Sequence, residues 1–133
     1  MAELIVKTKD IVSNIKKLSA YLKENDIEWT LVTKVLSGNK EVLEKILIPE
    51  ALEDVQSVAD SRLSNLKTIK LINPNIRTMY IKPPAIQSIK TVVSVADISL
   101  NSSIETIEAL NKEAKRQGKI HKVIIMMEMG ELR

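Results

Sequence analysis

The sequence predicts an α/β fold, in which about five parallel strands alternate with helices as part of a βα barrel. Segments rich in β-branched residues alternate with segments whose apolar residues recur at helical spacing. The first strand-like segment is largely apolar on both faces, which is typical of a strand covered on both sides. The tetrapeptide Ser-Val-Ala-Asp occurs at 57–60 and again at 94–97. Either this repetition is chance among small residues, or two strands end alike at the mouth of one barrel.

The predicted elements follow from these patterns in order. Strands are predicted at 29–36, 55–60, 77–81, 92–98 and 123–127. Helices are predicted over 10–22, between Asn39 and Pro49, over 63–72, for a short distance after Pro83, and from 104 to Gly118. Asp10, Asn39 and Ser102 or Ser103 are the expected N-caps, because their side chains can accept a free backbone N–H. Gly118 stands where the residue after a helix often takes a left-handed conformation.

Lys34 is the chain's most informative residue, because it stands at the carboxyl end of the first predicted strand. Val32 shares its face of that strand. A desolvated lysine has a lowered pKa and forms Schiff bases with aldehydes such as pyridoxal phosphate. The alternative is a lysine that only reaches solvent at a strand end. In a βα barrel Asp60, Asp97 and Glu128 would lie at the same rim as Lys34.

Composition excludes several classes of function. A net charge of +3, from 20 basic and 17 acidic residues, and only three Trp and Tyr residues argue against a nucleic-acid-binding surface. Cysteine is absent and His121 is the single histidine, so neither a zinc site nor a Ser-His-Asp triad is expected. The first residues lack the apolar segment of a signal peptide, and no apolar run could span a membrane. We therefore expect a cytoplasmic protein.

The length conflicts with a closed barrel. A βα barrel needs eight units and about 250 residues, whereas this chain has 133. The last predicted strand is also too apolar for an open sheet edge. Either the chain is a piece of a longer protein, which we favour, or a second copy covers its edges.

Four stretches resemble the amino-terminal barrel domain of the alanine racemase family, the fold type III pyridoxal-phosphate enzymes. They are the strand ending Thr-Leu-Val-Thr-Lys at 30–34, Ala-Asp-Ser-Arg-Leu-Ser-Asn-Leu at 59–66, Ala-Asp-Ile-Ser-Leu-Asn-Ser at 96–102 and Met-Glu-Met-Gly-Glu-Leu-Arg at 127–133. The match is closest to the ornithine-racemase-like branch. It implies that residues 1–133 are the amino-terminal part of such a barrel, without the rest of the barrel and the carboxy-terminal β domain.

The resemblance implies a pyridoxal-phosphate-dependent amino-acid racemase, an isomerase, as the parent protein. Lys34 would form the internal aldimine and serve as one of the two racemisation bases. Arg133 would lie beside the phenolic oxygen of the cofactor, and Val32 and Ile81 would pack against the cofactor. Asn101 would present its amide at the rim of the pocket. The partners implied are a small amino-acid substrate and a second subunit, in a homodimer or through exposed strand edges.

Departures from the family pattern leave alternatives open. Gly38 stands where alanine racemases have a tyrosine, which favours an amino acid other than alanine. The loops that hold the phosphate and the opposing base are absent, so we expect the 133-residue chain alone to be inactive. One alternative is the pyridoxal-phosphate homeostasis protein, a carrier with the same barrel but no turnover. Another is an interaction module in which Lys34 has no chemical role.

Overall fold

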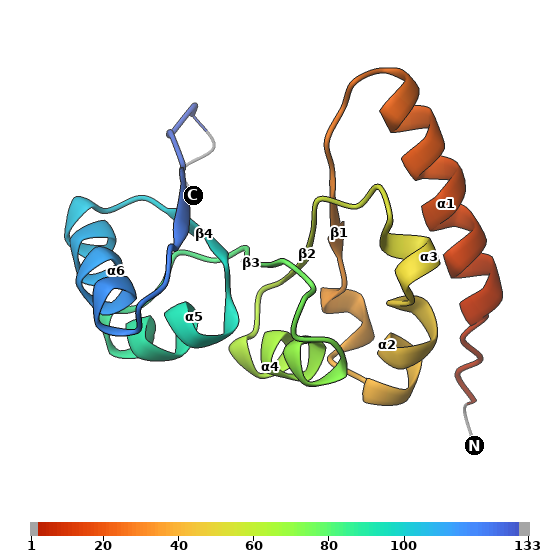
Figure 1. Cartoon of the computed structure of the whole chain (residues 1–133), viewed down its shortest axis with the longest axis horizontal. Helices are drawn as coiled ribbons and strands as arrows, with labels where there is room; N and C mark the ends of the chain where they lie inside the picture. Colours follow the sequence, from red (N-terminus) through yellow and green to blue (C-terminus); the bar gives the residue numbers. More distant parts are fainter. Residues whose placement is uncertain (1–2, 131–133) are drawn as a thin grey trace.

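The computed structural model describes residues 3–130 and shows an open parallel sheet with the strand order β1-β2-β3-β4-β5 (Figure 1). Its strands are β1 (Thr30–Val32), β2 (Ser57–Asp60), β3 (Thr78–Tyr80), β4 (Ile98–Asn101) and β5 (Lys122–Ile125). Each strand pairs in parallel with the next one along the chain. Parallel neighbours need crossover connections, and helices supply them. The predicted α/β class and the partial-barrel strand order are confirmed.

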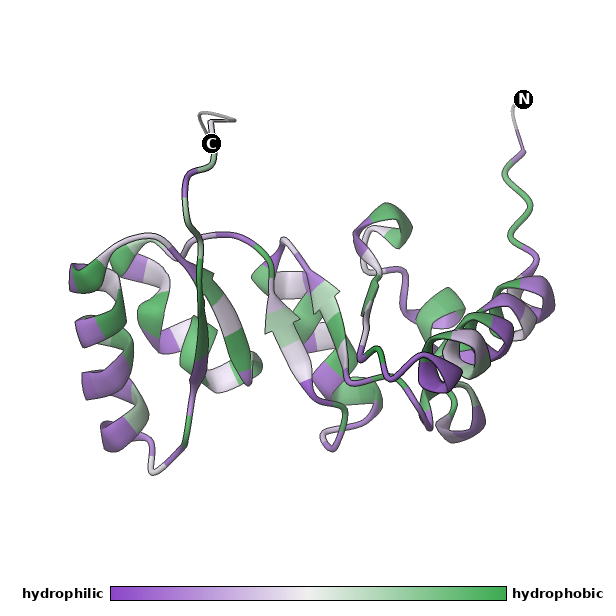
Figure 2. Cartoon of the chain, turned by 90° about the horizontal axis from the view of Figure 1, so that it is seen from above, coloured by the Kyte–Doolittle hydropathy of each residue, from purple (hydrophilic) through white to green (hydrophobic). Residues whose placement is uncertain are grey.

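The helices alternate with these strands. They are α1 (Thr8–Glu24), α2 (Lys40–Ile46), α3 (Pro49–Leu52), α4 (Leu63–Ile72), α5 (Ile89–Val95) and α6 (Ile104–Arg116), with short 3-10 helices η1 (Lys34–Leu36) and η2 (Ile86–Ser88). Helices α2, α4 and α5 follow one another along one side of the strands (Figure 1). Helix α6 is amphipathic, with hydrophilic residues along its outer side (Figure 2) and Leu110 and Ala114 buried.

The expected helix ends are largely as predicted. The Asn39 side chain accepts the Val42 backbone N–H at 3.0 Å at the start of α2. Ser103 begins α6 in the same way, and Gly118 follows that helix with φ +64°. The prediction that Asp10 is the N-cap of the first helix is wrong. Helix α1 begins at Thr8, so Asp10 lies in its first turn. There its carboxylate still lies near the positive end of the helix.

The core lies between the helices and the sheet. Leu66 and Ile69 of α4 are fully buried against Val58 of β2 and Val92 of α5. Side chains alternate across a strand, so the residues next to Val58 point to the other side of the sheet. On that side Ala59, Met79 and Ile98 form a second, much smaller apolar cluster. One face of the sheet therefore carries the helices, and the other carries little cover.

The predicted strand at 92–98 is wrong. Residues Ile89–Val95 form helix α5, and the strand begins only at Ile98. Val92, Val93 and Val95 are β-branched, which suggested a strand. All three are buried in the core beside α4 and α6, and this packing outweighs their intrinsic preference.

The repeated tetrapeptide therefore has two structures. At 57–60 it is strand β2, whereas at 94–97 it ends helix α5 and leads into β4. Asp60 lies at the carboxyl end of its strand, and Asp97 precedes the amino end of β4. Asp97 accepts hydrogen bonds from the Thr78 backbone N–H at 2.7 Å and the Lys70 ammonium at 2.8 Å. The repetition is chance, and the expectation that Asp97 lies at the same rim as Lys34 is wrong.

The last strand, β5, lies at an open edge of the sheet, although its sequence is apolar. Every residue of β5 is exposed, and Ile125 is 66% accessible. The residues that follow are also apolar and exposed, with Met127 at 79% and Met129 at 85%. In the part of the chain that the structure describes, no helix is both long and apolar enough to cross a membrane.

Candidate active site at the carboxyl ends of the strands

Lys34 directly follows the first strand. The strand prediction over 29–36 is too long, because β1 ends at Val32 and Lys34 begins the 3-10 helix η1. The chain turns at Thr33, whose φ of −105° and ψ of 2° are no longer those of a strand. The turn ends at Ser37 and Gly38, with φ of +51° and +72°. Two consecutive left-handed residues stop an extended chain, and glycine adopts that conformation with the least strain.

The Lys34 side chain is accessible. It is exposed, and within residues 3–130 no hydrogen bond or ion pair engages its ammonium group. Val32, the last residue of β1, is 45% exposed, and it lies on the face of the sheet that the helices leave uncovered. The expectation of a first strand buried on both faces around a desolvated lysine is wrong for this structure. What the geometry offers is an unpaired amine at the carboxyl edge of a parallel sheet.

A buried carboxylate joins the Lys34 turn to the next strand. Asp60 is fully buried at the end of β2. Its Oδ1 accepts the Arg62 backbone N–H at 2.9 Å and the Asn65 side-chain amide at 3.1 Å. Its Oδ2 faces the Thr33 hydroxyl, which donates across 3.4 Å. Asp60 therefore lies at the expected rim, next to the residue that precedes Lys34.

Sequence reasoning missed Thr33 and Asn65 as members of this cluster. Thr33 is 2% exposed and Asn65 is 6% exposed. Asn65 lies within the resemblance at 59–66, but nothing in the sequence showed that its amide would reach a strand end five residues earlier. The signal that could have indicated it is the order Asp60, Asn65 after a buried strand. An aspartate there can accept both a backbone N–H and a side-chain amide from the following turn.

The face of the sheet that the helices leave uncovered continues from Lys34 as an apolar surface. Val32 is opposite Ala59 in the strand register, and Ala59 is opposite Met79. Ile81 packs against the same small cluster just beyond β3. The arrangement brings an exposed primary amine and apolar side chains to the same region of the sheet, and a primary amine can form a Schiff base with an aldehyde.

Comparison with known proteins shows which fold the chain has. No protein-family model matches the chain. Ornithine racemase from Acetoanaerobium sticklandii is 36% identical over 129 residues, which are 97% of this chain and 34% of that protein. Alanine racemase from Clostridium difficile superposes with a TM-score of 0.71 at 18% identity, over 93% of this chain and 32% of that one. The chain has an alanine-racemase-like fold. It spans about a third of the length of the curated relative that it matches.

In this racemase-like fold the remaining predicted site residues lie in different places. Asn101 ends β4 and is fully buried. Its amide donates to the Ser99 carbonyl at 2.9 Å and to the Ser99 hydroxyl at 3.1 Å. Because residues two apart share a face, Asn101 points to the same side of the sheet as Ser99, whose register partner Tyr80 belongs to the core beneath the helices. The expectation that Asn101 presents its amide at the rim of the pocket stays a prediction. Arg133 lies outside the described residues.

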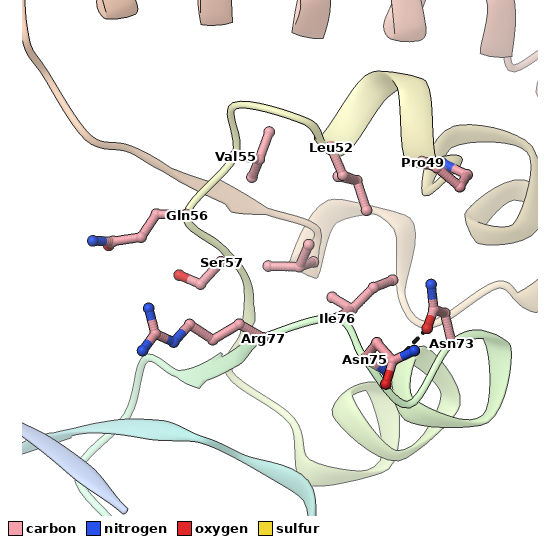
Figure 3. A pocket seen from close by; sticks show the side chains of 10 residues that line it. Pro49, Leu52, Val55, Gln56, Ser57, Asn73, Asn75, Ile76 and Arg77 are labelled. Carbon is pink, nitrogen blue, oxygen red and sulfur yellow. Dashed lines mark hydrogen bonds between the residues drawn. The ribbon is translucent and has the colours of Figure 1, made fainter.

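A cavity of about 450 Å³ lies near the amino ends of the strands, at the end of the sheet opposite to Lys34 (Figure 3). Gln56 and Ser57 at the start of β2 and Arg77 just before β3 contribute to its lining. Neither Lys34 nor the Asp60 cluster lines it. In βα barrels catalytic groups gather at the carboxyl ends of the strands, whereas the amino ends serve stability. We therefore assign the candidate site to the Lys34 end and not to this cavity.

Proposed function

We propose that this chain is the lysine-bearing part of a pyridoxal-phosphate-dependent amino-acid racemase. The observation that carries the proposal is the accessible amine of Lys34 beside an uncovered apolar face of the sheet. The 36% identity to an ornithine racemase supports the same conclusion. The cofactor, when bound, supplies an electron sink for the charge that develops when the substrate loses its α-proton.

The chain's own residues would bind the cofactor and move a proton. Lys34 would hold the cofactor covalently and, once released from it, transfer a proton to or from the α-carbon of the substrate. Val32 and Ile81 would orient the ring by packing on it. By the same resemblance, Arg133 would act on the phenolic oxygen of the cofactor, because a guanidinium stabilises a negative charge. We also infer an amino acid other than alanine as substrate, with ornithine favoured by the relative.

Racemisation needs a second base on the opposite face of the substrate, and we propose that a second subunit supplies it. The parent enzyme would then be a homodimer. The 133-residue chain alone is expected to leave the optical rotation of an L-ornithine solution unchanged. Rapid racemisation by the purified chain would contradict this division of the two bases.

The decisive experiment locates covalent cofactor on the chain. The purified protein is mixed with limiting pyridoxal phosphate, reduced with borohydride and analysed by peptide mass spectrometry. We expect most of the adduct on Lys34, because its amine is accessible and adjoins an apolar surface. Lys82 is the matched control, since it is also exposed and lies just past the carboxyl end of a strand.

Two variants sharpen the result. Lys34→Ala should abolish the selective adduct, and Lys82→Ala should leave it unchanged. Labelling spread evenly over the lysines, and unaffected by Lys34→Ala, would overturn the proposal. A selective adduct together with no turnover in the extended dimeric protein would instead favour a cofactor carrier.

A further inference from the structure

The turn that carries Lys34 is held at its two ends by residues of β2 and α4. At its start, the Thr33 backbone N–H donates to the Ala59 carbonyl at 2.9 Å, which extends the parallel pairing by one residue. The Thr33 hydroxyl donates to the same carbonyl at 3.2 Å and faces Asp60. Within the turn, the Ser37 N–H donates to the Lys34 carbonyl at 3.1 Å.

The far end of the turn rests on Asn65. Gly38 has φ +72°, and a Cβ built on it would lie 2.5 Å from Asn65 Oδ1 and 2.9 Å from Asn65 Cγ. Any side chain at position 38 would therefore collide with the Asn65 amide as well as being strained by its backbone angle. Glycine at this position allows the backbone of the turn to touch Asn65.

The two ends are connected through one buried carboxylate. Asn65 donates its amide to Asp60 Oδ1 at 3.1 Å, and Asp60 Oδ2 faces the Thr33 hydroxyl. Contacts therefore run from Thr33 through Asp60 and Asn65 to Gly38 and enclose the turn that carries Lys34. We call these four residues the Lys34 clamp. All of its side chains are buried, so water competes little for their hydrogen bonds.

We propose that Asn65, held by Asp60, is a positioning residue that fixes the backbone of the Lys34 turn, and that Gly38 is its required counterpart. The proposal deepens the proposed function and rests on it for its chemical consequence, because a fixed turn limits the positions that the Lys34 amine can take. It also gives a physical reason for glycine at position 38. A tyrosine side chain could not occupy this position while Asn65 holds its place.

The first test measures the turn without cofactor. Amide hydrogen exchange is compared between the unsubstituted chain, Asn65→Ala and the control Asn111→Ala, whose asparagine is exposed on α6. We expect the Ser37 and Asn39 amides to exchange about fivefold faster in Asn65→Ala, since the loss of one buried hydrogen bond costs about 1 kcal/mol. Amides of α6 should be unaffected, and Asn111→Ala should leave the turn unchanged.

The second test measures the amine itself. In Asn65→Ala the reduced pyridoxal-phosphate adduct on Lys34 should fall about fivefold relative to the adduct on Lys82. Lys82 is the internal reference, because a general loss of stability would change the adducts on both lysines alike. Thr33→Val has nearly the same shape as the native residue and removes only the hydroxyl, so it tests the other end of the clamp should Asn65→Ala fail to fold. It should increase exchange at the same turn amides.

A double-substitution cycle tests the contact between Gly38 and Asn65. Gly38→Ala alone should disturb the turn strongly, because the new Cβ meets the Asn65 amide. In the Asn65→Ala background the same change should be several-fold less harmful to exchange at Ser37, because only the backbone strain remains. Additive effects would show that the two residues do not depend on each other.

The outcomes separate this inference from the proposed function. If the unsubstituted chain shows no selective adduct on Lys34, the proposed function fails, and hydrogen exchange still decides whether the clamp holds the turn. If the adduct is selective for Lys34, but neither exchange nor selectivity changes in Asn65→Ala and Thr33→Val, the positioning role is overturned.

Discussion

At the scale of single residues, Asp60 and Asp97 each follow the sequence Ser-Val-Ala, but they lie at opposite ends of the sheet. Asp60 is enclosed by neutral donors near Lys34. Asp97 pairs with the Lys70 ammonium at 2.8 Å near the amino ends of β3 and β4. Burial raises the pKa of Asp97. The hydrogen bonds from Lys70 and Thr78 and the positive charge of Lys70 lower the pKa by more than burial raises it, so it stays below its ordinary value. Asp97 therefore serves stability and not chemistry.

The lowered pKa of Asp97 predicts an acid-dependent stability. A carboxylate whose pKa is lower in the folded chain stabilises the fold above its unfolded pKa of about 4, and this contribution is lost as the pH falls further. Asp97→Asn should reduce the free energy of unfolding at neutral pH and flatten its decline below about pH 4. Urea unfolding across that range measures both effects. An unchanged acid slope in the variant would contradict the assignment.

His121 predicts a second pH dependence at a higher range. Its Nε2 lies 2.8 Å from the Ser99 hydroxyl and its Nδ1 lies 3.1 Å from the Ala96 carbonyl. Burial lowers the pKa of His121, although the Ala96 carbonyl and the Asp97 charge oppose this shift. The folded chain thus favours the neutral ring, and stability should be lost as the pH falls below about 6.5. His121→Gln should remove the decline between about pH 7 and pH 5 in urea unfolding.

At the scale of elements, capping residues place the helices accurately along the chain. Asn39 satisfies the Val42 N–H immediately after the Lys34 turn, so it fixes where α2 begins. Ser103 and Gly118 mark the two ends of α6 in the same local way. Such signals depend on a few neighbouring residues, which explains why these boundaries could be predicted.

The cap at Asn39 gives a stability prediction for one element. Asn39→Ala should lower the free energy of unfolding by about 1 kcal/mol, because the Val42 N–H loses its acceptor. Asn111→Ala in the exposed part of α6 is the control and should be neutral or slightly stabilising, since alanine is the better helix former. Equal losses in the two variants would show that the Asn39 side chain does not act as a cap.

At the scale of the whole molecule, the sheet has two exposed edges and one face with little cover. The edge strand β5 and the residues after it expose Ile125, Met127 and Met129. Unpaired edge strands with apolar side chains tend to pair with another chain. We therefore propose that the 133-residue chain self-associates at these edges.

Self-association is tested by sedimentation over a range of protein concentrations. The unsubstituted chain should shift from monomer to larger species as its concentration rises. Ile125→Lys should weaken this shift, because a charge on an edge strand opposes edge-to-edge pairing. A clean monomer at every concentration of the unsubstituted chain would refute the proposal.

The alternating pattern of the sequence was sufficient for the α/β class, for the strands at β2, β3 and β5, and for Lys34 at the end of the first strand. These features arise from local spacing and from the order of elements along the chain. The pattern failed at α5, because burial beside α4 and α6 outweighs the strand preference of three valines. It also could not show that Asn101 points to the helix side, or that Asp60 and Asn65 meet Thr33 and Gly38. Contacts between residues distant in sequence depend on how strands and helices pack, and only the tertiary structure decides them.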